Sequence, residues 1–326
     1  MKKQEIEKSK KILLSILIIL VFFLGTFIFN IFFKAKVEKD KILTSTNTVN
    51  SFLKNGPGVG IIRVEGAIEM NSQVDLLGLP SGSDMIVKQL DELEKNNNIK
   101  AIVVRINSPG GTVAATQEIY DKLWSLRTKG IQLVASLGDL AASGGYYIAS
   151  ACNFIMANHG SLTGSIGVIA SSPNLKNLFE KLGIKMNVIK SGEYKDILAS
   201  HRDLTPNEKK MLQEMIDSTY QKFLADAAQG RQLKIKEIKP YADGRIMNGA
   251  MALKYKLIDG LGSLAKSILK AKELANLPLD APVYDKQQNT WQQFMTSLQG
   301  ILSKGILNSI NFNYNSLYNL EYKYLP

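Results

Sequence analysis

The chain has 326 residues, of which 45% are hydrophobic and 21% are charged, so it can bury a sizeable core, and wholesale disorder is excluded. The formal net charge of +11 comes mainly from lysine, and no basic cluster is interleaved with aromatic residues, which argues against a nucleic-acid partner. The single cysteine, Cys152, rules out an intrachain disulfide, and its apolar surroundings predict a buried packing residue.

The N-terminal part of the sequence is expected to anchor the chain in a membrane. Residues 1–11 form a basic tail, and the apolar run 12–33 would span about 33 Å as a helix, close to the thickness of a bilayer's hydrocarbon core. A cleaved signal peptide would have a shorter apolar region that ends in small residues. Lysines flank the run on both sides, so the positive-inside rule barely fixes its orientation. Residues 34–56 are typical of a linker.

Beyond the linker, short apolar runs alternate with helical patterns, which predicts one α/β domain over 57–280. One helix has a clear start, because Thr205 and Glu208 form a capping box around Pro206. No segment repeats another, so the domain occurs once. Strands are expected at 59–64, 99–106, 131–137, 154–157, 166–170 and 184–189, and helices at 83–97, 112–128, 143–151, 173–182, 205–228 and 263–275.

The C-terminal segment 281–326 differs from the domain in character. Apolar residues recur at helical spacing between Trp291 and Leu307, which predicts an amphipathic helix that packs on the domain or on a neighbour, or lies in the membrane interface. A loosely ordered end rich in tyrosine follows. Its apolar residues suggest a further hypothesis, in which the tail enters the active site as a substrate-like segment.

Two glycine-bearing turns supply a candidate nucleophile and its backbone donors. Gly110 and Gly111 follow a predicted strand and would let backbone N–H groups point at a substrate carbonyl, as an oxyanion hole requires. Ser143 lies near the start of a predicted helix, where free N–H groups favour developing negative charge, and Gly144 would offer a second donor. Each turn alone is also compatible with a tight packing motif.

A third turn and a lysine supply a candidate base. A lysine side chain can accept the proton of a serine hydroxyl only when it is desolvated, and a hydroxyl can hold the neutral amine without recharging it. Lys195, in Ser191-Gly192-Glu193-Tyr194-Lys195-Asp196, is the candidate base. Ser165 is the candidate hydroxyl that orients it, with Thr163 in reserve. Taken alone, Lys195 would be read as a solvated surface lysine.

Four segments resemble, in order and spacing, the motifs of the signal peptide peptidase A family of membrane-anchored serine-lysine peptidases. They are residues 105–111, 141–147, 163–168 and 191–196, and the likeness covers about 57–275. The resemblance implies the caseinolytic protease and crotonase-like fold of strand-strand-helix units. It also assigns Ser143 as nucleophile, Lys195 as general base, Ser165 as the group that orients the lysine, and Gly110 or Gly111 with Gly144 as oxyanion donors.

The same resemblance implies where the protein works and with what. We expect a single-pass protein of the cell membrane, held by its N-terminal helix, with the catalytic domain on the extracytoplasmic side. Its substrates would be apolar peptides such as released signal peptides, and no cofactor or metal is implied. Short family members with one domain copy assemble into rings whose serine and lysine come from neighbouring protomers. We therefore expect a homo-oligomeric ring, of octamer size, with a shared active site.

Three alternatives remain open at this point. His159 follows the nucleophile in sequence, as the histidine base does in related caseinolytic proteases, although no acidic partner for it is evident. A crotonase-like acyl-CoA enzyme would share the fold and the paired backbone N–H groups but would not need Ser143 and Lys195. A catalytically silent membrane scaffold that binds peptides is the third alternative.

Overall fold

The structure is a computed structural model, and it describes residues 56–70, 82–285 and 321–323. The expected anchor at 12–33 and the helix expected between Trp291 and Leu307 lie outside these residues. In the part of the chain that is described, no helix is both long and apolar enough to cross a membrane. The elements below therefore belong to the expected α/β domain and to a short segment near the end of the chain.

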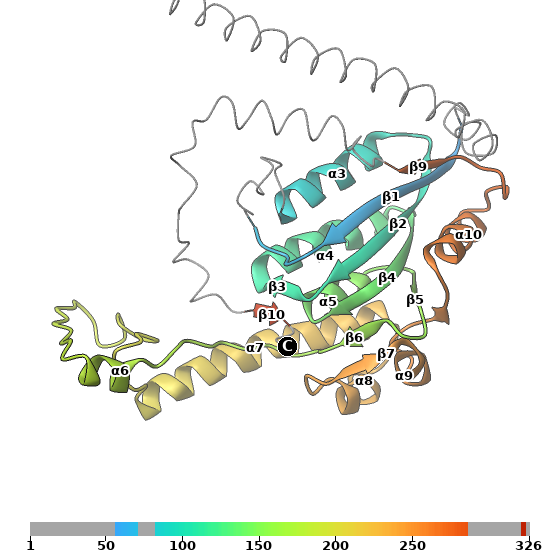
Figure 1. Cartoon of the computed structure of the whole chain (residues 1–326). Helices are drawn as coiled ribbons and strands as arrows, with labels where there is room; N and C mark the ends of the chain where they lie inside the picture. Colours follow the sequence, from blue (N-terminus) through green and yellow to red (C-terminus); the bar gives the residue numbers. More distant parts are fainter. Residues whose placement is uncertain (1–55, 71–81, 286–320, 324–326) are drawn as a thin grey trace, which may run out of the picture. The chain divides into compact units, whose positions relative to one another are not determined.

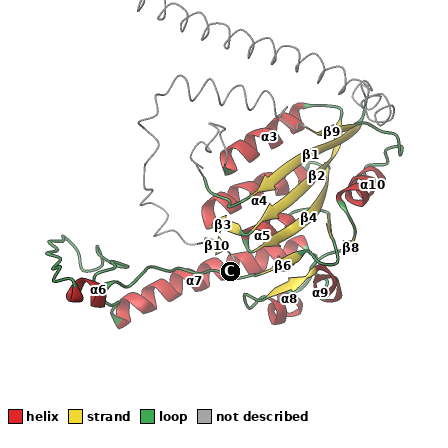
Figure 2. Ribbon diagram, viewed as in Figure 1, coloured by secondary structure: helices red, strands yellow, loops and turns green. Residues whose placement is uncertain are grey.

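A mainly parallel β-sheet forms the centre of the domain (Figures 1 and 2). The strand order is β7-β6-β4-β2-β1-β9, β5 pairs with β4 and β8, and only β7 runs antiparallel to its neighbour. The strands of this sheet are β1 (Gly58–Glu65), β2 (Ile99–Ser108), β4 (Gln132–Ala142), β5 (Phe154–Ala157), β6 (Leu162–Gly164), β7 (Ile246–Asn248), β8 (Gly260–Leu261) and β9 (Val283–Asp285). A separate antiparallel pair joins β3 (Gly110–Thr112) to β10 (Glu321–Lys323).

Helices cover both faces of the sheet, because the side chains of its strands alternate between two apolar clusters. In β2, Ile102 and Val104 face the larger cluster, which includes residues of α3, α4, α5 and α7, whereas Ala101 and Val103 face α10. The helices are α3 (Ser83–Lys95), α4 (Val113–Thr128), α5 (Gly144–Ser150), α6 (Lys176–Lys181), α7 (Pro206–Gly230), α8 (Ile235–Ile238), the 3-10 helix η1 (Lys239–Tyr241), α9 (Gly249–Lys254) and α10 (Leu264–Leu274). This α/β arrangement agrees with the fold class expected from the sequence.

The predictions of two strands are wrong. The strand expected at 166–170 lies earlier, as β6, because Gly164 and Ser165 both have positive φ and end the extended run. The strand expected at 184–189 is not formed, since its residues are exposed and pair with no other strand of the described chain. Cys152 is fully buried, as expected, and burial raises the pKa of its thiol to about 12.

Helix α7 connects the body of the domain to a projecting arm, which we define as residues 171–204. Thr205 and Glu208 form the predicted capping box at the start of α7. Between Glu208 and Phe223 no residue of α7 is buried, whereas its C-terminal part packs on α5. No residue of the arm is buried either, and Figure 1 shows α6 near the free end of α7, away from the sheet.

Candidate active site

Ser143 lies at the sharp turn where β4 passes into α5. Its backbone has φ 53° and ψ −117°, a conformation that a non-glycine residue adopts only when its surroundings impose it. The N–H of Ser143 donates to the carbonyl of Gly164 at 2.8 Å, and the Ser143 carbonyl accepts the N–H of Tyr147 at 2.9 Å. Ser143 is 1% exposed. The strained strand-to-helix turn therefore holds this serine in one fixed position, as a nucleophile requires.

Gly144 lies directly against the glycine turn of β3. A Cβ atom on Gly144 would lie 3.1 Å from Gly110 Cα and 3.2 Å from Gly111 N, so the two backbones approach closely only because Gly144 lacks a side chain. The N–H of Gly110 already donates to Ser108 Oγ at 3.1 Å. Gly111 is paired with Tyr322 of β10, so both predicted donors, Gly110 and Gly111, lie beside Gly144 with partners of their own.

Ser165 follows the strand that pairs with the nucleophile strand. In the parallel pair of β4 and β6, Ala142 is the partner of Gly164, so Ser143 and Ser165 each directly follow a paired residue. Ser165 has φ 51°, is 7% exposed and donates its N–H to the carbonyl of Arg245 at 2.7 Å. The structure thus brings Ser143, Gly144, the Gly110-Gly111 turn and Ser165 close together at the ends of neighbouring strands.

Three polar side chains hold the backbone that leads to Ser143. Ser161 Oγ donates to the Gly138 carbonyl at 2.5 Å, Thr163 Oγ1 donates to the Ala141 carbonyl at 2.7 Å, and Asn107 Oδ1 accepts the N–H of Leu140 at 3.1 Å. Thr163, the reserve candidate for orienting the lysine, is thus engaged with the β4 backbone. Sequence reasoning did not predict these supporting roles. The alternation of hydroxyl residues at 161, 163 and 165 is the signal that could have indicated them.

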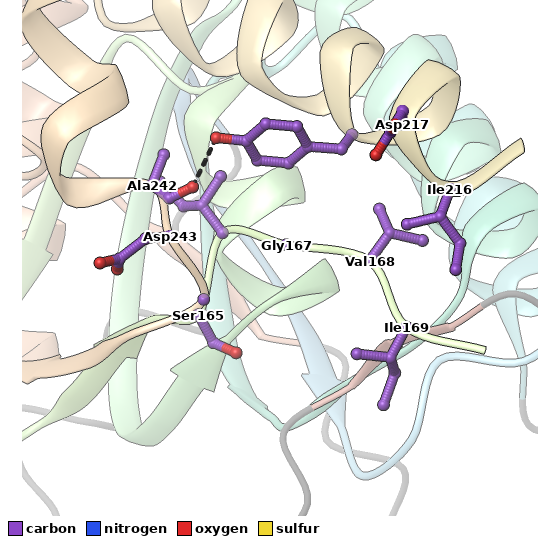
Figure 3. A pocket seen from close by; sticks show the side chains of 11 residues that line it. Ser165, Gly167, Val168, Ile169, Ile216, Asp217, Ala242 and Asp243 are labelled. Atoms are coloured by element: carbon purple, nitrogen blue, oxygen red, sulfur yellow. Dashed lines mark hydrogen bonds between the residues drawn. The ribbon is translucent and has the colours of Figure 1, made fainter. Parts of the chain in front are cut away.

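A cavity of about 610 Å³ lies beside Ser165. Figure 3 shows Ser165 near one end of this cavity and Ile169 and Ile216 near the other. Tyr220 belongs to the lining, and its hydroxyl donates to the Ala242 carbonyl at 2.6 Å. Apolar side chains make up much of the lining, and Asp217 adds negative charge, whereas the Asp243 carboxylate is paired with Arg245. The cavity can therefore accommodate an apolar segment that also carries a cation.

Lys195 lies on the projecting arm and is exposed. Its backbone N–H donates to the Gly192 carbonyl at 3.2 Å, and no hydrogen bond links it to Ser143 or Ser165 in the described part of the chain. Helix α7 extends about 25 Å between Pro206, beside the arm, and Phe223, where the helix meets the body. The structure therefore does not bring Lys195 to the serine of its own chain.

The segment around Lys195 is held by a network of ion pairs. Arg202 Nε and Nη2 donate to the Asp196 carboxylate at 3.0 and 2.7 Å, and Arg202 Nη1 and Nη2 donate to Glu208 at 2.9 and 2.6 Å. Hydrogen bonds from Arg202 lower the pKa of Asp196 below its usual range and that of Glu208 to about 2. Both carboxylates are therefore charged at neutral pH.

His159 occupies the turn after β5 and is exposed. No hydrogen bond joins His159 to Ser143 among the residues that the structure describes. The rival pairing of Ser143 with His159 thus has no geometric support here, and a substitution at His159 tests it.

A short strand near the C-terminus lies against the glycine turn. Strand β10 pairs antiparallel with β3, with Tyr322 opposite Gly111 and Lys323 opposite Gly110. The loosely ordered end expected from the sequence therefore includes one short strand, placed beside the predicted oxyanion donors. An extended backbone can evidently pair with β3 at this position, as a peptide bound by strand addition would.

Comparison with known proteins places this chain among the peptidases. The family model for peptidase family S49 matches residues 125–278, and the model for Clp protease matches residues 67–157. A Synechocystis sp. protein named as a protease is 45% identical over 210 residues, which are 64% of this chain and 76% of that protein. The chain therefore belongs to the signal peptide peptidase A family, peptidase family S49.

Two further relatives carry more specific names. Serine protease SPPA, chloroplastic, of Arabidopsis thaliana is 34% identical over 227 residues, which are 69% of this chain and 33% of that protein. An Enterococcus faecium protein named as a signal peptide peptidase, SppA, is 34% identical over 205 residues, which are 62% of this chain and 58% of that protein. The matched region thus spans about a third to three quarters of the length of these three relatives. Their names support protease activity as the general function of the family.

Proposed function

We propose that the protein is a serine endopeptidase in which Ser143 is the nucleophile and Lys195 the general base. The observation that carries the proposal is the close approach of Gly144 to Gly110 and Gly111 beside a strained, buried Ser143. Backbone N–H groups at this distance suit the negative oxygen of a tetrahedral intermediate. A turn that served only packing would not need a serine in a conformation this uncommon.

In the proposed reaction, Lys195 takes the proton of Ser143 as its oxygen attacks the peptide carbonyl. The N–H groups of Gly144 and of Gly110 or Gly111 stabilise the oxyanion that forms. The intermediate collapses to an acyl-enzyme while Lys195 returns the proton to the leaving amine. The neutral Lys195 then activates a water molecule, which releases the acyl group and restores Ser143. Ser165 would accept a hydrogen bond from the lysine amine, or donate one to its neutral nitrogen, and so fix its position.

We propose that the base comes from a second copy of the chain. Lys195 is exposed on an arm without buried residues, and the arm carries large exposed apolar side chains, such as Leu182, Met186 and Ile189 at 62%, 55% and 102% exposure. Such a surface is typical of an interface. The cavity beside Ser165, with its isoleucines and Asp217, complements an apolar arm rich in lysine. A ring of identical copies would let each arm reach the next serine.

The proposed substrates are released signal peptides and other apolar peptides derived from the membrane. Support comes from the apolar run 12–33, which would hold the site beside the bilayer as a single-pass anchor, with the domain on the extracytoplasmic side. The name of the Enterococcus faecium relative points to the same substrate class. An anchored enzyme would meet such peptides at a raised local concentration.

Peptide cleavage separates this proposal from its rivals. The solubilised full-length chain should cleave a fluorogenic apolar peptide and should be labelled at Ser143 by a serine-directed acylating probe. A crotonase-like enzyme would turn over an acyl-CoA thioester without labelling at Ser143. A binding scaffold would do neither. Failure of both cleavage and labelling in an assembled sample would refute the proposed peptidase function.

The position of β10 predicts that the tail competes with added peptide. Deletion of residues 321–326 should lower the KM for an apolar peptide several-fold, because the strand that pairs with β3 is removed. Replacement of Tyr322 by proline should act in the same direction, since proline lacks the backbone N–H that strand pairing uses. Tyr322→Ala is the matched control that keeps the N–H. A KM equal to that of the wild type in both the deletion and Tyr322→Pro would contradict the competition.

A further inference from the structure

Arg202 is the most connected side chain of the arm that carries Lys195. Besides its two pairs of hydrogen bonds to Asp196 and Glu208, it donates from Nη2 to the Asp196 carbonyl at 3.1 Å and from Nη1 to the Asp203 carbonyl at 3.1 Å. Its side chain is 25% exposed, whereas those of Asp196 and Glu208 are 13% and 2% exposed. An otherwise solvated arm thus contains one partly buried ionic cluster.

The cluster joins the residue after Lys195 to the first turn of α7. Glu208 accepts the N–H of Thr205 at 2.8 Å and belongs to the capping box of α7. The far part of α7 packs on α5, where the Tyr147 hydroxyl donates to the Asp226 carboxylate. A continuous path of helix and hydrogen bonds therefore runs from the helix after Ser143 to Asp196.

The same cluster keeps the Asp196 carboxylate from pairing with Lys195, its neighbour in sequence. Lys190 Nζ donates to Asp196 Oδ1 at 2.7 Å and to the Glu193 carbonyl at 2.7 Å, so the turn is held on both sides of Lys195. With Arg202 and Lys190 as its partners, Asp196 is fully engaged. The Lys195 side chain is left pointing to solvent, without an ion pair among the described residues.

We propose that Arg202 is a positioning residue, which fixes the turn of Lys195 to the first turn of α7 and so presents the lysine amine to the serine of a second copy. This inference rests on the proposed role of Lys195 as base. The guanidinium suits the task because its planar fork binds two carboxylates at once, which the single ammonium of a lysine cannot reproduce. Without the guanidinium, the turn that carries Lys195 would no longer be fixed in position relative to α7.

The test measures kcat and KM of the full-length chain with an apolar peptide. Arg202→Gln and Asp196→Asn should each lower kcat by about 10- to 100-fold with KM within about twofold, because a misplacement of about 1 Å costs this much in rate. Arg202→Lys should lie between Arg202→Gln and the wild type. The double variant should lose no more than the worse single variant, since both residues act as one unit. Asp203→Asn is the matched control and should stay within about twofold, because the Asp203 carboxylate pairs with Lys176 at 2.8 Å and only its backbone carbonyl, which the substitution keeps, contacts Arg202.

Several results would overturn the inference. A wild-type kcat in Arg202→Gln, or losses that multiply in the double variant, would show that Arg202 does not act through Asp196. If Arg202→Gln does not assemble, Arg202→Lys decides, and a wild-type kcat there overturns the inference. Full activity of Lys195→Ala would instead refute the proposed role of Lys195 as base. That result is distinguishable from a failure of the Arg202 proposal alone. Light scattering and the thermal unfolding midpoint report on assembly and folding in each variant.

Discussion

Replacing Ser143 or Lys195 with alanine should each lower peptide cleavage by a factor on the order of 1,000 or more, because nucleophile and base act as one unit and removal of either stops acylation. The residual rate would come from the oxyanion donors and from substrate binding alone. Ser143→Ala removes one hydroxyl from a fixed turn, and Lys195→Ala shortens an exposed side chain, so neither substitution should disturb the fold. The measurement is the initial rate with a fluorogenic apolar peptide.

His159→Ala provides the control for this experiment. His159 is exposed in the turn after β5, so its replacement should leave both the fold and the rate close to those of the wild type. Loss of activity in His159→Ala, combined with full activity in Lys195→Ala, would replace the serine-lysine dyad by a serine-histidine pair. Acylation of Ser143 by a serine-directed probe should disappear in Ser143→Ala and slow strongly in Lys195→Ala.

Local sequence patterns predicted the elements that form through interactions between residues close in sequence or through continuous apolar runs. The start of α7 was predictable because Thr205, Pro206 and Glu208 satisfy the free N–H groups of a helix start among themselves. The strands at the centre of the sheet were predictable because a parallel sheet covered on both faces needs continuous apolar runs. The shift of β6 was not predictable, since it depends on the positive φ of Gly164 and Ser165 against the Arg245 backbone.

The candidate site was predictable as a set of residues but not as an arrangement. Motif order singled out Ser143, Ser165, Lys195 and the glycine turns, whereas the close approach of Gly144 to Gly110 and Gly111 is a tertiary contact that required the structure. The engagement of Thr163 with the β4 backbone, and that of Arg202 with Asp196 and Glu208, depend on tertiary contacts that no spacing encodes. The separation of the arm from the body is likewise a property of how α7 packs.

A shared active site is the central claim, and complementation between two inactive variants should produce a large effect. Ser143→Ala chains keep Lys195, and Lys195→Ala chains keep Ser143. If each site takes its serine from one copy and its lysine from the next, an assembly mixed at random in equal amounts should recover about a quarter of the wild-type activity per chain. Each variant alone should be inactive. Sites formed within one chain would remain inactive in any mixture.

The decisive measurement is therefore the cleavage rate of co-assembled Ser143→Ala and Lys195→Ala chains, purified through two different tags so that every assembly contains both. Assemblies of each variant that carry both tags are the matched controls. Recovery of activity only in the mixed assembly is the result that we expect. A mixed assembly as inactive as its controls, from chains that both assemble like the wild type, would contradict a dyad shared between copies.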